Sequence, residues 1–97
     1  MAQVTQDKQL LEQIDHYLDY LVRTWEGVPL DAQEWDTWDD FSRLNYDLDW
    51  GVPNDRLAQL RGWAKQEIFT PSQQALYEEL ETLIAKNQPV LDRMLAG

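Results

Sequence analysis

Apolar residues recur at spacings of three and four along most of the chain, and this period constrains the fold more than any other feature. The first segment is the clearest case. Its periodic positions are Leu10, Leu11, Ile14, Tyr17, Leu18, Leu21, Val22 and Trp25. No stretch alternates apolar and polar residues convincingly enough to indicate a β-strand. With 97 residues, the sequence predicts one domain, a small all-α bundle of four to five helices.

Start and stop signals divide this pattern into segments. Thr70-Pro71-Ser72-Gln73 is a strong start signal, because Thr caps, Pro suits the first helical position and Gln can return a capping bond. Asp31 and Glu34 have a similar capping spacing, which predicts a helix start at Asp31. Pro89 predicts a kink or a separate short terminal helix. The predicted helices lie near residues 6–26, 31–49, 54–68, 71–87 and 89–96.

Two of the predicted stops share a short pattern. Trp25-Glu26-Gly27-Val28-Pro29 is echoed by Trp50-Gly51-Val52-Pro53. We interpret both as helix ends, in which Gly takes a left-handed cap conformation and Pro prevents continuation. An internal duplication is the alternative, but the echo covers too few residues to establish a repeat.

The stretch from Asp31 to Trp50 concentrates both aromatic and acidic residues, with seven acidic residues and one basic residue. Read as one helix, its broad apolar arc holds Trp35, Trp38, Phe41, Leu44, Tyr46 and Leu48. Its opposite side holds Asp36, Asp39, Asp40 and Asp47, together with Arg43. The simpler expectation is that the apolar arc packs between two other helices, and the alternative is that part of it is a docking surface.

Composition excludes several classes of protein. The net charge of −10 repels polyphosphates, so we expect no direct binding of nucleic acid. There is no cysteine, which excludes disulfides and thiolate metal sites and favours a cytoplasmic location. The N-terminal residues lack the basic and apolar regions of a signal peptide, and no run of eighteen apolar residues predicts a membrane span.

Catalytic and metal-binding patterns are weak, so we expect neither an enzyme nor a bound cofactor or metal. The single histidine, His16, has Glu12 and Asp19 nearby on the polar side of the first helix, where a solvated side chain is the simplest interpretation. Residues 45–49 resemble the opening of a calcium loop, but its required Gly is one position late at Gly51, and Arg56 replaces the final Glu.

The acidic side of the 31–49 helix is therefore the distinctive feature. One interpretation is a solvated surface. The other is a binding surface for a basic protein partner, as in small inhibitors, immunity proteins or antitoxins. The predicted partner-binding residues are Asp36, Asp39, Asp40 and Asp47, with Trp50 as an exposed anchor. The alternative is a helical scaffold that self-associates through its Trp-rich face, so the chain is expected to be a monomer or a homodimer.

Overall fold

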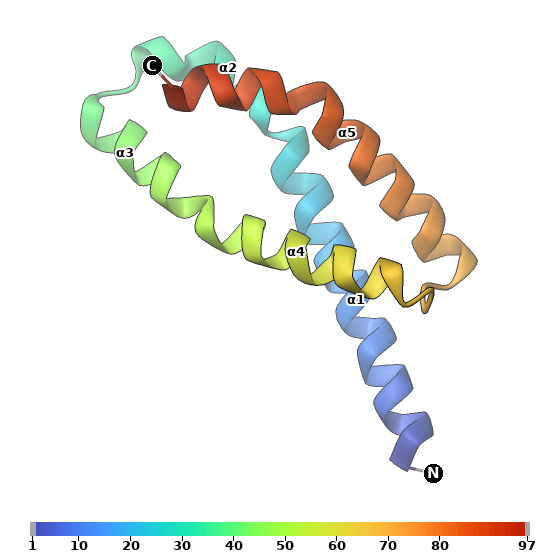
Figure 1. The fold of residues 1–97 in the computed structure, drawn as a ribbon. Coiled ribbons are helices and arrows are strands. Elements are labelled where there is room, and N and C mark those ends of the chain that lie inside the picture. The colour runs from blue at the N-terminus through green and yellow to red at the C-terminus, as the bar shows by residue number, and fades with distance from the viewer. Residues whose placement is uncertain (1, 97) are drawn as a thin grey trace.

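A computed structural model of the chain describes the backbone of residues 2–96 and the side chains of residues 8–96. The described residues form helices and no strands, which confirms the predicted all-α class (Figure 1). The elements are α1 (Ala2–Glu26), α2 (Val28–Glu34), the 3₁₀ helix η1 (Trp35–Thr37), α3 (Asp40–Asp49), α4 (Gly51–Lys65) and α5 (Pro71–Ala96).

These elements do not make the predicted bundle of four to five separate helices. Figure 1 shows three long arms, in which α1 is the first, α3 and α4 run end to end as the second, and α5 is the third. The molecule is elongated, with extents of 53 × 23 × 17 Å. α1 packs against both α4 and α5, while α2 packs against α5.

One hydrophobic core joins the three arms. Its buried apolar members are Ile14, Leu18, Leu21, Trp25, Val28, Trp50, Leu57, Leu60, Trp63, Leu80, Ile84, Leu91 and Met94. The apolar stripe of α1 supplies the first four of these residues, as its three-and-four spacing predicts. Leu60 and Leu80 are also fully buried, as expected from their helical stripes.

α1 ends at Glu26, which is the predicted boundary, but the predicted left-handed cap at Gly27 is wrong. Gly27 has a right-handed conformation (φ −75°, ψ −18°), its N–H donates to the Arg23 carbonyl, and its own carbonyl accepts from Asp31 N–H. The helical path therefore passes from α1 into α2 with only Gly27 between them. Pro29 is tolerated because it lies in the first turn of α2, where its missing N–H removes no helical bond.

The second predicted stop has the same outcome: α3 ends at Asp49 as predicted, but the predicted left-handed cap at Gly51 is wrong. Trp50 is right-handed (φ −73°, ψ −10°) and α4 begins at once at Gly51, ahead of the predicted start at Asn54. The Asn54 N–H donates to the Trp50 carbonyl at 3.0 Å. Pro53 is buried in the first turn of α4, so it contributes to the core instead of ending a helix.

The predicted helix at 31–49 is divided into three pieces. Asp31 lies inside α2 and does not cap it, because α2 begins at Val28. The chain then tightens into η1 and becomes extended at Trp38 (φ −82°, ψ 144°). The true cap is Asp39, whose carboxylate accepts the Ser42 N–H at 2.7 Å and starts α3.

The start of α5 follows the prediction. The Thr70 hydroxyl accepts from Gln73 N–H at 3.2 Å, and the Gln73 side-chain oxygen accepts from Thr70 N–H at 3.0 Å. Gln73 is buried and also donates to the Leu11 carbonyl and to Asp15 Oδ1. One side chain therefore caps α5 and joins it to α1.

Of the two alternatives predicted at Pro89, the separate terminal helix is wrong, because α5 continues through Pro89 to Ala96. The buried positions Ile84, Asn87, Leu91 and Met94 keep a three-and-four spacing across the proline, so the same face remains in the core. Pro89 and Ala85 are both exposed, which leaves the unpaired Ala85 carbonyl accessible to water. Figure 1 shows α5 bending in this half.

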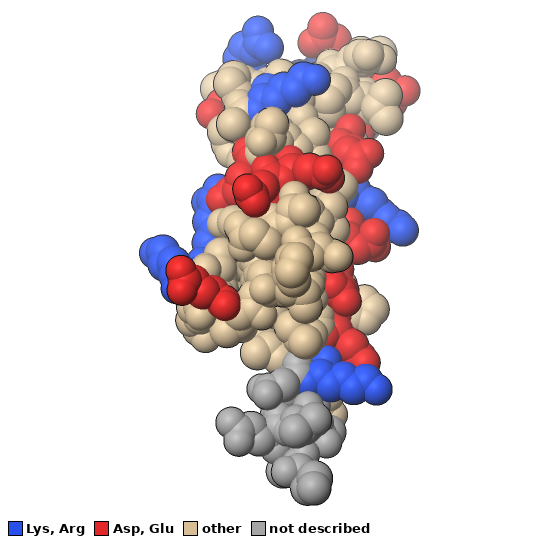
Figure 2. Space-filling model, turned by 90° about the vertical axis from the view of Figure 1, so that its right-hand side faces the viewer, with Lys and Arg blue, Asp and Glu red and all other residues tan. Residues whose placement is uncertain are grey.

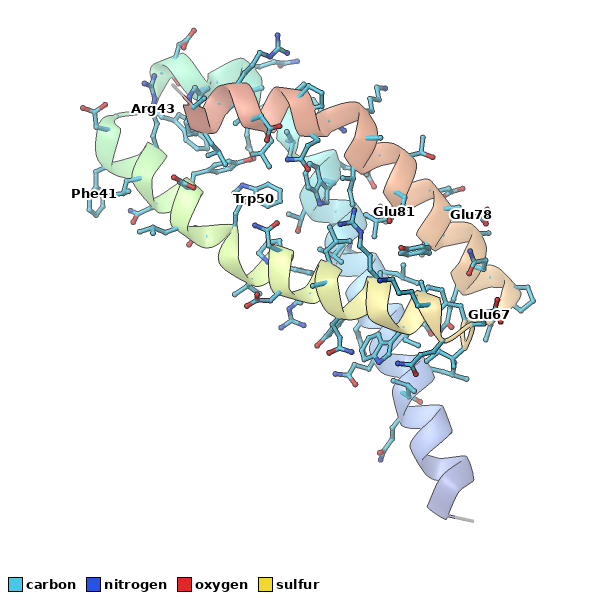
Figure 3. The ribbon with its side chains drawn as sticks, in the orientation of Figure 1. Phe41, Arg43, Trp50, Glu67, Glu78 and Glu81 are labelled. Carbon is cyan, nitrogen blue, oxygen red and sulfur yellow. The ribbon has the colours of Figure 1, made fainter. Side chains whose placement is uncertain are left out.

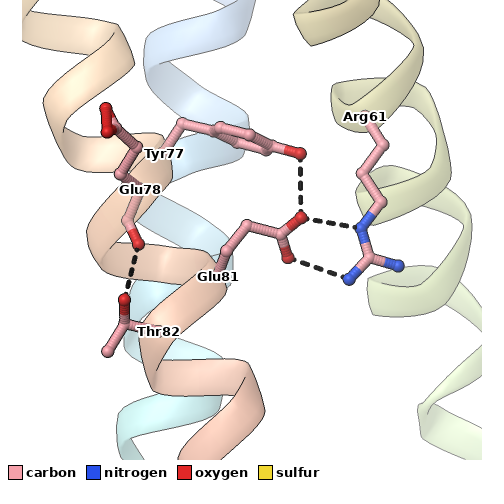
Figure 4. Close-up of polar contacts among 5 residues, drawn as sticks. All are labelled: Arg61, Tyr77, Glu78, Glu81 and Thr82. Atoms are coloured by element: carbon pink, nitrogen blue, oxygen red, sulfur yellow. Dashed lines mark hydrogen bonds and ion pairs between the residues drawn. The ribbon is translucent and has the colours of Figure 1, made fainter.

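A polar contact joins the second and third arms (Figure 4). Arg61 of α4 donates from Nε and Nη2 to the two carboxylate oxygens of Glu81 in α5, at 3.1 and 2.8 Å. The Tyr77 hydroxyl donates to the same carboxylate at 2.9 Å. The paired guanidinium lowers the pKa of Glu81 below its ordinary value.

Candidate surface for a partner

α3 is held against the protein by its inner side, although none of its residues is buried. Arg43 donates from Nε and Nη2 to the Trp35 carbonyl, at 3.1 and 2.8 Å, and its guanidinium lies over the Trp35 ring. Figure 3 shows Arg43 and Phe41 on different sides of α3. Arg43 lines one groove with Asp40 and Asp47, as the predicted shared face requires, and its guanidinium turns within this groove toward η1.

An aromatic cluster fills the space under α3. It consists of Trp35, Trp38, Tyr46 and Trp50, and Tyr46 lies between 5.4 and 6.1 Å from each of the three indole rings. Desolvation raises the pKa of the Tyr46 hydroxyl well above its ordinary value, and nearby Asp31 adds to the shift. This cluster is the packed part of the predicted apolar arc, and it holds α3 in position over α2 and η1.

Trp50 is part of this interior, so the prediction that it is an exposed anchor is wrong. Its side chain is only 6% exposed and its ring lies 4.9 Å from that of Trp25 (Figure 3). Trp50 immediately precedes α4, and its ring is turned inward against Trp25 near the end of α1.

The four predicted aspartates are all exposed, but they come from different elements. Asp36 lies in η1, Asp39 precedes α3, and Asp40 and Asp47 lie within α3. The break at Trp38 separates Asp36 from the others, so the four do not share one helical face as predicted. The capping bonds from Ser42 lower the pKa of Asp39, which gives this residue a structural role as well.

Asp40 and Asp47 are brought together along one edge of α3. They line a shallow groove of about 190 Å³ between α3 and the end of α5. Leu44 lies between them in sequence and lines the same groove, and Met94 and Leu95 form its opposite wall. Carboxylates bordering an apolar floor are suited to a basic side chain with an apolar neighbour.

The outward side of α3 is apolar, so part of the predicted apolar arc is exposed. Phe41, Leu44, Leu48 and Val52 are 72, 55, 68 and 53% exposed. Their spacings of three, four and four place them along one stripe, which we call the outer stripe. Sequence reasoning placed Phe41, Leu44 and Leu48 in the same arc as the tryptophans. The spacing itself separates them, because the half-buried Tyr46 and the buried Trp50 lie on the opposite side of the helix.

Negative charge also occurs elsewhere on the molecule. Figure 2 shows acidic side chains along one edge of a different face and across its middle, beside a large uncharged area. Acidity alone therefore does not distinguish α3 from the rest of the surface. The distinguishing feature is the combination of Asp40 and Asp47 with an exposed apolar stripe.

The other clefts do not add a clear chemical site. One cleft of about 340 Å³ contains Asp31, Asp49 and Tyr46, and another of about 430 Å³ contains His16, Arg23 and Arg56. Among the described residues, no group of three or more His, Asp or Glu side chains is placed to hold a metal ion. Residues 45–49, which resemble a calcium loop, belong to the helix α3.

Within the described part of the chain, no helix combines the length and apolar character needed to cross a membrane. Comparison with known proteins gives no family to which the chain can be assigned: no family model, no curated protein and no solved structure matches it.

Proposed function

We propose that the protein is a small non-catalytic interaction module that binds a basic protein partner through η1 and α3. The observation that carries this proposal is the position of α3, which is fixed by Arg43 and the aromatic cluster yet buries none of its own residues. A helix anchored by one side and open on the other presents its surface without first having to become ordered.

The charge of this surface supports a basic partner. Asp36, Asp40 and Asp47 are exposed, and the one basic residue of α3, Arg43, donates to the Trp35 carbonyl on the inner side. Arg43 also lines the groove of Asp40 and Asp47, but three aspartates against one arginine leave the surface with a net negative charge. Such a field accelerates the association of a positively charged protein and selects against negatively charged ones. An inhibitor, immunity protein or antitoxin would use the surface in this way.

Self-association through the Trp-rich face has less support. Trp50 is buried, and Trp35 and Trp38 contact each other and Tyr46 in the aromatic cluster. Little of that face is left for a second copy.

A matched pair of variants tests the proposal. In the first, Asp36, Asp40 and Asp47 are replaced by Asn, and Asp39 is kept because it caps α3. In the second, the exposed residues Glu12, Glu78 and Glu79 are replaced by Gln, which changes the net charge equally. Immobilised proteins are then used to capture partners from a lysate at low and moderate salt.

We expect the wild type and the Gln variant to capture the same basic protein at low salt, and the Asn variant to capture much less. Association should be slower for the Asn variant, and added salt should reduce the difference because it screens the same field. Equal capture by the two variants, or capture that is indifferent to salt, would contradict the proposal.

A further inference from the structure

We infer that the outer stripe is a docking site for an amphipathic helix of a partner protein, with basic residues beside its apolar face. This inference rests on the proposed function and identifies the form of its partner. It makes the apolar side chains of α3, and not the aspartates alone, responsible for holding the complex together.

The geometry of α3 and the start of α4 supports a helical partner. At about 100° per residue, the outer stripe lies opposite the positions that face the protein, which are Arg43, Tyr46 and Trp50. Figure 3 shows Phe41 projecting away from the other arms, while Trp50 points between them. A straight row of apolar side chains at spacings of three and four matches the apolar face of another helix.

The charges beside the stripe determine which helix fits. Asp40 and Asp47 flank the outer stripe on the side of the groove, and Asp49 flanks it on the opposite side. An apolar helix with Lys or Arg on both flanks would place positive charge against both borders. A second copy of this chain is disfavoured as the partner. It would place its own three carboxylates against those of the first copy, and each copy carries a net charge of −10.

The test measures binding of a synthetic peptide. The probe has Leu at helical spacing with Lys on both sides, and a second peptide has the same composition in an order that scatters the Leu around the helix. Affinity and dissociation rate are measured for the wild type and for a Phe41→Ser/Leu48→Ser variant. Leu30→Ser is the matched control, because Leu30 is 64% exposed but lies in α2.

We expect the double variant to bind the amphipathic peptide at least about tenfold more weakly, mainly through faster dissociation, because two large apolar contacts are lost. Leu30→Ser should bind like the wild type, and the scattered peptide should bind weakly to every protein. All three proteins should keep the same helix content and melting temperature, since the replaced side chains are exposed.

Three results would overturn the inference. The first is equal binding of the two peptides. The second is equal weakening by Leu30→Ser and by the double variant. The third is light scattering that shows a dimer of the free protein which Leu48→Ser dissociates, since a second copy would then cover the stripe.

The aspartate variants separate this inference from the proposed function. If the Asn variant weakens binding and the double Ser variant does not, the proposed function stands and the outer stripe is not the docking site. If the Asn variant behaves like the Gln variant, charge does not select the partner, and both proposals fail.

Discussion

The indole rings of Trp25 and Trp50 lie 4.9 Å apart, with their planes at 59°. Each tryptophan stands at the start of one of the two similar Trp-to-Pro segments, so the two segments meet in space where the end of α1 faces the start of α4. This contact buries both rings in the shared core.

Replacement of Trp50 tests this role. We expect Trp50→Ala to lower the free energy of unfolding by roughly 3–5 kcal/mol, because it removes a buried ring in contact with Trp25 and Tyr46. Leu21→Ala, at a fully buried site of α1, is the reference variant and should lower the free energy of unfolding by roughly 2–5 kcal/mol. Urea unfolding measures both values. Unchanged stability of the Trp50 variant would show that the ring is not part of the core.

The Arg61–Glu81 pair predicts a specific dependence on pH. The pKa of Glu81 is lowered in the folded state, so its contribution to stability is present above its ordinary value of 4.5 and is lost as pH falls through the folded value. Both side chains are partly exposed, so the contribution at neutral pH should be about 1 kcal/mol or less.

Glu81→Gln should therefore destabilise the protein at neutral pH and make its melting temperature fall less steeply below pH 4.5. Glu78→Gln is the control, since the Glu78 side chain is exposed and only its backbone carbonyl bonds to Thr82 in this region (Figure 4). If the melting temperatures of Glu81→Gln and of the wild type fall equally steeply below pH 4.5, the prediction is wrong.

Gly62 lies inside α4, where the sequence leaves open a close helix crossing or a simple imperfection. A Cβ built at Gly62 meets no heavy atom within 4 Å, so no neighbour requires a glycine there. We expect Gly62→Ala to stabilise the protein by about 0.5–1 kcal/mol, because Ala loses less backbone freedom on folding. Gly27→Ala should increase the stability less, since the added Cβ would lie 3.4 Å from the Thr24 carbonyl oxygen. Lower stability of the Gly62 variant would reveal a crossing at this position.

Local patterns predicted much of the interior. The period of α1 identified Leu18 and Leu21 as buried, and the Thr70–Gln73 capping box forms with both of its predicted bonds. Such predictions succeed because a helical period or a cap depends on residues within one or two turns. Trp38 and Leu83 are only partly buried. Trp38 falls in the extended break before α3, outside any helical stripe.

The candidate surface was only partly predictable. The sequence indicated exposed aspartates at Asp36, Asp40 and Asp47, and the structure exposes them. It did not reveal that Asp39 is a cap, because Asp31 offered an equally good capping pattern on a longer helix. It also did not separate the outer stripe from the aromatic cluster, because the assumption of one unbroken helix placed the two groups in one wide arc.

The sequence by itself determined that the chain is helical and which apolar faces its helices possess, because both depend on local spacing. Tertiary packing decided where helices continue and which apolar residues face outward. A Gly-Val-Pro sequence, as at residues 27–29 and 51–53, is compatible with either the end or the start of a helix. In the structure both segments start a helix, and Val28 of the first and Pro53 of the second pack into the core. Likewise, α3 has apolar residues on two sides, and only contact with Trp35 and Trp25 determined that Tyr46 and Trp50 turn inward and Phe41 and Leu48 turn to solvent.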